Sequence, residues 1–95
     1  MEMTRGVKIK IAIADVRNLF LGVLSGAITR ENADRWAYLI IQKNEADELE
    51  FSPPQDREKI WSGVMYLYGI DMRESPDEYL HTAQDIRTAM WQIQI

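Results

Sequence analysis

The stretch Asp15–Gly26, DVRNLFLGVLSG, sets the fold of this 95-residue chain. Its large apolar residues recur at i, i+3, i+4, i+7 and i+8, the spacing of one face of an α-helix. They are Val16, Leu19, Phe20, Val23 and Leu24. Asp15 suits the N-cap of this helix, and Ser25-Gly26 suits its end. We therefore expect a helix over residues 15–26 that packs its apolar face against other helices.

The same periodicity recurs in three segments further along the chain. They are residues 29–46, 55–68 and 82–93. Thr29 is a good N-cap for the first of these, and Gly69 can end the second in the left-handed conformation. Thr82 and Asp85 have the spacing of a capping box before the third. These signals predict four helices joined by short connections.

The segments outside the four helices are less regular. Residues 7–13, VKIKIAI, alternate apolar with polar or small side chains, which is typical of a short strand or of an extended arm laid over helices. Residues 71–81 are polar and contain Pro76, so we expect an ordered loop there. No later segment suggests a partner strand. The sequence therefore predicts an all-α fold, with an N-terminal arm over residues 1–14 and a single helical domain over residues 15–95, a compact bundle of four main helices.

Composition limits the classes of function. The chain has no cysteine, which excludes disulfides and thiolate metal sites and is typical of a reducing cytoplasm. No apolar run approaches the roughly 18–20 residues of a membrane-spanning helix. The net charge is −4: residues 1–44 hold seven Lys/Arg and four Asp/Glu, whereas residues 45–95 hold four and eleven. A negative C-terminal half argues against nucleic acid as a partner and favours a basic protein surface.

Catalytic chemistry has few candidates in this sequence. His81 is the single histidine, and neither a cysteine nor a recognisable nucleophile motif accompanies it. There is no glycine-rich phosphate loop, and the acidic residues near His81 lack the spacing of a calcium loop. We expect no enzymatic activity, no cofactor and no bound metal.

Two acidic groups and one tryptophan are the candidate contacts for a partner. The first group is Asp71, Glu74, Asp77 and Glu78, and the second is Glu45, Asp47 and Glu48. The second group follows the end of a helix, where the helix dipole disfavours negative charge; either docking to a basic partner or solubility explains it. Trp91 lies off the apolar line of the last helix, so it is either exposed or covers a neighbouring helix; in the exposed case it is an apolar anchor for self-association.

Three strings carry a resemblance to a known group of proteins. They are GAITRENADRWA (26–37), KIWSGVMYLYGID (59–71) and PDEYLHTAQDIRTAM (76–90). They resemble small uncharacterised bacterial helical proteins that are similar to the immunity proteins of polymorphic or contact-dependent toxin systems. The resemblance covers residues 15–92 and leaves the Lys-rich segment before Ile11 outside. It implies a role in neutralising a toxin domain.

Two functional hypotheses follow. The first is a non-catalytic cytoplasmic protein that blocks a basic toxin domain with its acidic face, through charge complementarity and steric occlusion. The second is a structural module that forms a homodimer through residues 7–13 or through Trp91. Neither hypothesis includes nucleic acid or membrane as a partner.

Overall fold

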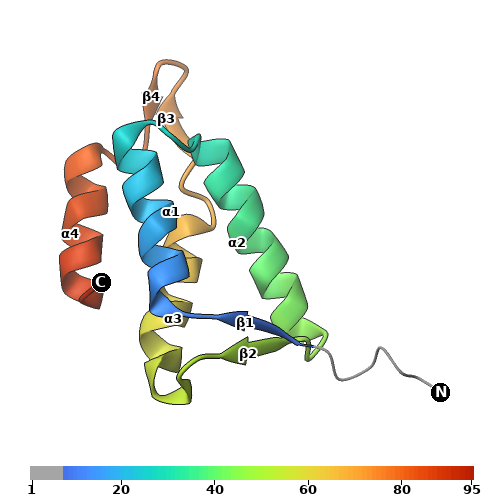
Figure 1. The fold of residues 1–95 in the computed structure, drawn as a ribbon. Coiled ribbons are helices and arrows are strands. Elements are labelled where there is room, and N and C mark those ends of the chain that lie inside the picture. Colours follow the sequence, from blue (N-terminus) through green and yellow to red (C-terminus); the bar gives the residue numbers. More distant parts are fainter. Residues whose placement is uncertain (1–7) are drawn as a thin grey trace.

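The computed structural model describes residues 8–95, and four α-helices make up most of this part of the chain (Figure 1). They are α1 (Ile13–Ser25), α2 (Arg30–Glu45), α3 (Arg57–Leu67) and α4 (Ala83–Ile93), with a short 3-10 helix, η1 (Pro54–Asp56), before α3. The four predicted helices are confirmed, with ends that differ by one or two residues. The domain division into residues 1–14 and 15–95 stays a prediction, and residues 1–7 lie outside the described part.

The start of α1 differs from the prediction. Asp15 lies in the first turn rather than at the N-cap, which is Ala12. The Asp15 carboxylate accepts a hydrogen bond from the backbone N–H of Ala12 at 2.8 Å, and the N–H of Asp15 donates to the Ala12 carbonyl at 3.0 Å. Asp15 therefore stabilises the helix start from the third helical position, where the dipole also favours an acid.

Two small sheets correct the prediction of a purely all-α fold. β1 (Ile9–Ile11) pairs in parallel with β2 (Leu49–Phe51), so the strand predicted within residues 7–13 does have a partner in this chain. The residues expected to form a loop contain an antiparallel hairpin of β3 (Arg73–Ser75) and β4 (Glu78–Tyr79). The fold is mostly helical with short strands. β2, β3 and β4 have only two or three residues each and no longer alternating stretch around them, so the sequence did not indicate these three strands.

The core lies where the four helices pack together, and α2 contributes Ala33, Ala37 and Ile40 to it. Val16 and Phe20 of α1, Ile60 and Val64 of α3 and Ile86 of α4 are fully buried. Gly63 lets α1 approach α3 closely, because a Cβ at this position would overlap Cγ1 of Val16. The apolar faces read from the sequence thus meet in one core.

α1 and α2 are close together at the connection between them and diverge toward their other ends (Figure 1). The two helices meet at their connection, where the Ile28 side chain packs on Gly22 and Gly26 adopts φ 85°. At the other end, β1 and β2 lie across the space between the helices. Ile11 and Leu49 of these strands are buried, so the small sheet completes the core between α1 and α2.

The β3–β4 hairpin is attached to the start of α2. The Tyr79 ring has the Arg30 guanidinium 4.3 Å from its centroid and that of Arg73 at 4.4 Å. The Tyr79 hydroxyl donates to the Glu31 carboxylate at 3.1 Å. Arg30 also donates to the His81 carbonyl at 2.6 Å. These contacts order the segment that leads into α4.

Candidate functional site

His81, the single histidine, contacts the side chain of Tyr66. It is half-buried, and its Nδ1 atom lies 3.3 Å from the Tyr66 hydroxyl. Burial raises the pKa of Tyr66, and the negative charge of Asp85 acts in the same direction. Within residues 8–95 there is no group of three or more His, Cys, Asp or Glu side chains arranged to hold a metal ion. No helix of the same described residues has the length and apolar character needed to span a membrane.

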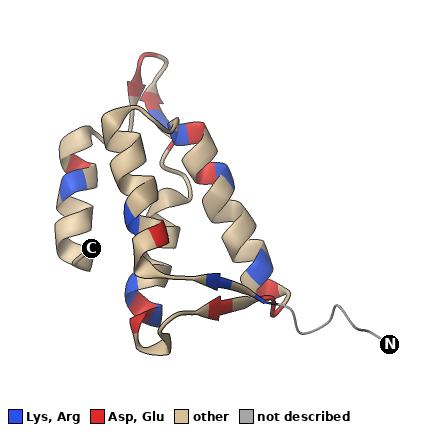
Figure 2. Cartoon of the chain, viewed as in Figure 1, with Lys and Arg blue, Asp and Glu red and all other residues tan. Residues whose placement is uncertain are grey.

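The first acidic group gathers at the β3–β4 hairpin. Glu74, Asp77 and Glu78 are exposed there, and Asp71 is half-buried just before β3. Figure 2 shows acidic residues concentrated at the tip of this hairpin. The structure therefore brings this group together, as the sequence suggests, on an element that projects from the helices.

The second acidic group lies at the other end of α2. Asp47 forms an ion pair with Lys8 at 3.5 Å, and Glu48 forms one with Lys43 at 3.3 Å. A helix of 16 residues is about 24 Å long, so α2 separates this group from the hairpin. The two acidic groups thus form two separate patches, and the second is partly neutralised by lysines.

The outer face of α4 has a different character. Gln84, Arg87, Thr88 and Trp91 recur at i, i+3, i+4 and i+7 and are all exposed. Trp91 is 80% exposed, the highest value among the large apolar side chains described. This four-residue set, here called the α4 stripe, contains no acidic residue.

Asp85, the acidic residue of α4, caps the start of the helix. Asp85 accepts a hydrogen bond from the backbone N–H of Thr82 at 3.0 Å, and the Thr82 hydroxyl accepts one from the N–H of Asp85 at 3.1 Å. This capping box confirms the one predicted and holds the Asp85 carboxylate at the helix start. Arg87 makes no ion pair with any described residue, so its guanidinium is available to a ligand.

The C-terminal end of α4 adjoins α3. A shallow depression there is lined by Lys59 and Ser62 of α3, by Gln92 and Gln94, and by one acid, Glu58. Of the four stripe residues, only Trp91 was predicted from the sequence as a partner contact; Gln84, Arg87 and Thr88 were not. Their helical spacing is visible in the sequence, yet only the packing of α4 shows that this side faces solvent.

Comparisons with known proteins point to one family. Residues 4–93 match the family described as "YxzC DNA-binding protein". A relative in Bacillus subtilis (strain 168), described as "Uncharacterized protein YxzC", is 32% identical over 69 residues, which is 73% of this chain and 51% of the relative. The chain therefore spans about half the length of that relative. No solved structure matches the chain significantly.

These findings correct the resemblance and the function inferred from the sequence. The family description names DNA binding, so the similarity to immunity proteins is wrong, and so are the toxin partner and the exclusion of nucleic acid. The same description gives no support to a purely structural, self-associating module. The match also begins at residue 4, so the basic segment before Ile11 lies inside it. With almost its whole length matched, this chain belongs to the family described as YxzC DNA-binding protein.

Proposed function

We propose that this protein binds duplex DNA and that the α4 stripe supplies the contacts to the bases. The family description supports the choice of ligand. The single structural observation that supports the surface is the exposed, acid-free set of Gln84, Arg87, Thr88 and Trp91 on a helix at the edge of the fold. A role on bacterial DNA also agrees with the cytoplasmic location expected from the sequence.

The chemistry of the stripe suits the major groove. An arginine can donate two hydrogen bonds to guanine, a glutamine can pair with adenine, and a threonine can contact either a polar edge or a thymine methyl group. An α-helix about 10–12 Å wide fits the major groove, which is about 12 Å wide. The stripe from Gln84 to Trp91 is about 10 Å long, which corresponds to roughly three base pairs. Its exposed indole adds an apolar contact at one end.

The charge distribution determines how the protein is oriented on the duplex. The acidic hairpin and the acidic end of α2 would repel phosphates, so the phosphates have to lie away from both. Glu74 and Glu78 line one pocket with Thr82 at the start of α4, so the duplex backbone has to avoid that end of the helix. The acidic residues predicted as partner contacts therefore do not belong to this interface; a role for them elsewhere stays a prediction. Arg87 is the one cation of the α4 stripe, and Lys59 lies on α3 at the depression near the end of α4. With Arg87 at a base, one phosphate contact from Lys59 corresponds to a slope of about −1 in log K against log salt.

The experiment compares two exposed arginines that lie on different helices. Arg87→Ala removes a guanidinium from the stripe. Arg35→Ala removes one from α2, on the opposite side of the fold, where Arg35 donates to Asn32 at 3.4 Å (Figure 1). Binding sites are first enriched from duplexes with a randomised core of about twenty base pairs, and affinities are then measured by fluorescence anisotropy.

We expect Arg87→Ala to weaken binding to the enriched site by about 5- to 150-fold, as loss of a bidentate base contact costs about 1–3 kcal/mol. Arg35→Ala should bind like the unaltered protein. Equal losses in the two variants would disprove the role of α4 while leaving DNA binding intact. Failure to enrich any duplex, with no binding at low salt, would disprove DNA binding itself.

A further inference from the structure

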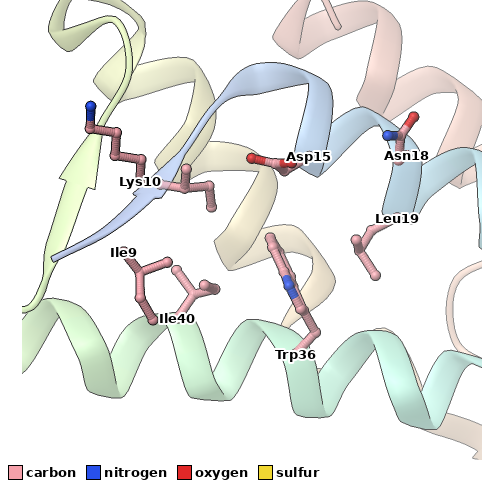
Figure 3. Close-up of a pocket in the computed structure, with 8 residues that line it drawn as sticks. Ile9, Lys10, Asp15, Asn18, Leu19, Trp36 and Ile40 are labelled. Atoms are coloured by element: carbon pink, nitrogen blue, oxygen red, sulfur yellow. The ribbon is translucent and has the colours of Figure 1, made fainter.

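A cleft between α1 and α2 lies outside the proposed DNA interface. It has a volume of about 370 Å³, within the range of small-molecule sites. Its lining consists of Ile9, Lys10, Ile11, Asp15, Asn18, Leu19, Trp36 and Ile40 (Figure 3). The cleft and α4 lie on different sides of α1 (Figure 1). A ligand in the cleft therefore does not have to compete with DNA on the α4 stripe.

The architecture keeps this cleft open. The contact between Gly22 and Ile28 joins α1 and α2 at one end, while β1 and β2 separate them at the other. Trp36 is only half-buried because it faces this opening. Side chains that line a gap lose dispersion contacts on one side. A ligand that fills the gap restores these contacts, which favours an apolar body with a flat or branched shape.

The charge at the cleft indicates the polar part of the ligand. Figure 3 shows the Trp36 indole extending from α2 toward α1, with the Asp15 carboxylate on the α1 side. The Lys10 side chain extends away from Trp36, toward β2. One carboxylate oxygen of Asp15 accepts from Ala12, and no described residue donates to the other. The cleft thus combines an aromatic face with a negative group, the pair that recognises organic cations.

We propose that this cleft binds a small arylalkylamine, an aromatic ring carrying an amine on a short alkyl chain, in its protonated form. The aromatic body packs against Trp36 and Leu19, and the ammonium group donates to Asp15. The same carboxylate disfavours phosphates and carboxylic acids, so the ligand differs in charge from DNA. This inference does not rest on the proposed DNA binding, because it uses none of the residues of the α4 stripe.

The test uses three probes that share a phenyl ring followed by two carbon atoms and differ in the charge of the terminal group. They are 2-phenylethylammonium, the neutral 2-phenylethanol and the anion phenylacetate. The readout is the NMR signal of the Trp36 indole N–H, assigned with Trp36→Phe. We expect 2-phenylethylammonium to shift this signal saturably at millimolar concentration. Phenylacetate should bind at least tenfold more weakly.

Two variants test the two halves of the site. Asp15→Asn keeps an oxygen that can accept from Ala12, and it should remove the preference for the ammonium probe over the neutral one. Ile9→Trp fills the cleft from a side chain that is 45% exposed, so it should block binding of all three probes without disturbing the core. Arg87→Ala should leave the titration unchanged.

Three outcomes would overturn the proposal. They are the absence of a saturable shift at Trp36, equal affinity for the ammonium and carboxylate probes, and an undiminished ammonium preference in a folded Asp15→Asn variant.

If Asp15→Asn does not fold, the Ile9→Trp variant alone tests the site. Binding of the ammonium probe that persists in this variant, whose cleft is filled, contradicts the proposal. DNA binding of each variant is measured separately, and its loss does not test the proposed amine site.

Discussion

Replacing Gly63 by alanine tests how tightly α1 packs on α3. The added Cβ would overlap Cγ1 of Val16 and lie 3.6 Å from Cε2 of Phe20. Val16 is fully buried, and its β-branched side chain has one strongly preferred rotamer in a helix. It therefore cannot turn away, and the clash has to be relieved by a shift of α1 or α3.

The magnitude follows from two opposing effects. Overpacking of a core costs about 1–3 kcal/mol, whereas alanine is about 1 kcal/mol more favourable than glycine within a helix. Because Val16 is so constrained, we expect the overpacking to prevail and the free energy of unfolding to fall by about 1–2 kcal/mol. For a domain of this size that corresponds to a melting temperature lower by roughly 5–15 °C.

The assay is thermal and urea unfolding followed by circular dichroism, arranged as a double-mutant cycle with Val16→Ala. Val16→Ala leaves a void and should destabilise the protein by itself. In the double variant the two changes compensate, so its destabilisation should be smaller than the sum of the singles by about 1 kcal/mol or more. Ser62→Ala, at an exposed position of α3, should change stability by less than about 0.5 kcal/mol. A more stable Gly63→Ala variant, or additive effects within about 0.5 kcal/mol, would refute the reasoning.

Two further predictions concern polar contacts that join distant segments. Asp34 accepts a hydrogen bond from the backbone N–H of Gly69 at 2.6 Å, so Asp34→Ala should lower the free energy of unfolding by about 1–3 kcal/mol, measured in urea, while Asp34→Asn should lose less. The pKa of Glu31 is lowered from 4.5 by a hydrogen bond from its own backbone N–H and by another from Tyr79. A lowered folded-state pKa means that this carboxylate stabilises the fold above the unfolded-state value and ceases to do so as the pH falls through the folded-state value. The difference in melting temperature between the unaltered protein and Glu31→Gln should therefore grow from about pH 3 to about pH 6, and a constant difference would contradict it.

The candidate interface shows why a charge count gave a wrong prediction of the partner. Residues 45–95 hold four Lys/Arg and eleven Asp/Glu, and this negative half argued against nucleic acid. Electrostatic interactions between exposed charges are screened over about 10 Å at ordinary salt, so an interface responds to its local charge rather than to the total. The acidic residues gather on the hairpin and at the end of α2, which leaves the α4 stripe without an acid. Trp91 was predicted as a candidate partner contact because it departs from the apolar line of its helix. The sequence did not distinguish Arg87 from the other charged residues that are exposed to solvent.

By itself the sequence determined the helices of this protein. Their periodicity, the caps at Thr29 and Thr82 and the glycine that follows α3 all act within a few residues, and such local effects can be read from neighbouring positions. Only the tertiary structure decided that Ile9–Ile11 pairs with Leu49–Phe51, that α2 diverges from α1, and which side of α4 faces solvent. These features depend on contacts between segments up to forty residues apart in the sequence. Whether a side chain is buried there depends on the shape of the segment that packs against it. Both the cleft beside Trp36 and the α4 stripe arise in this way.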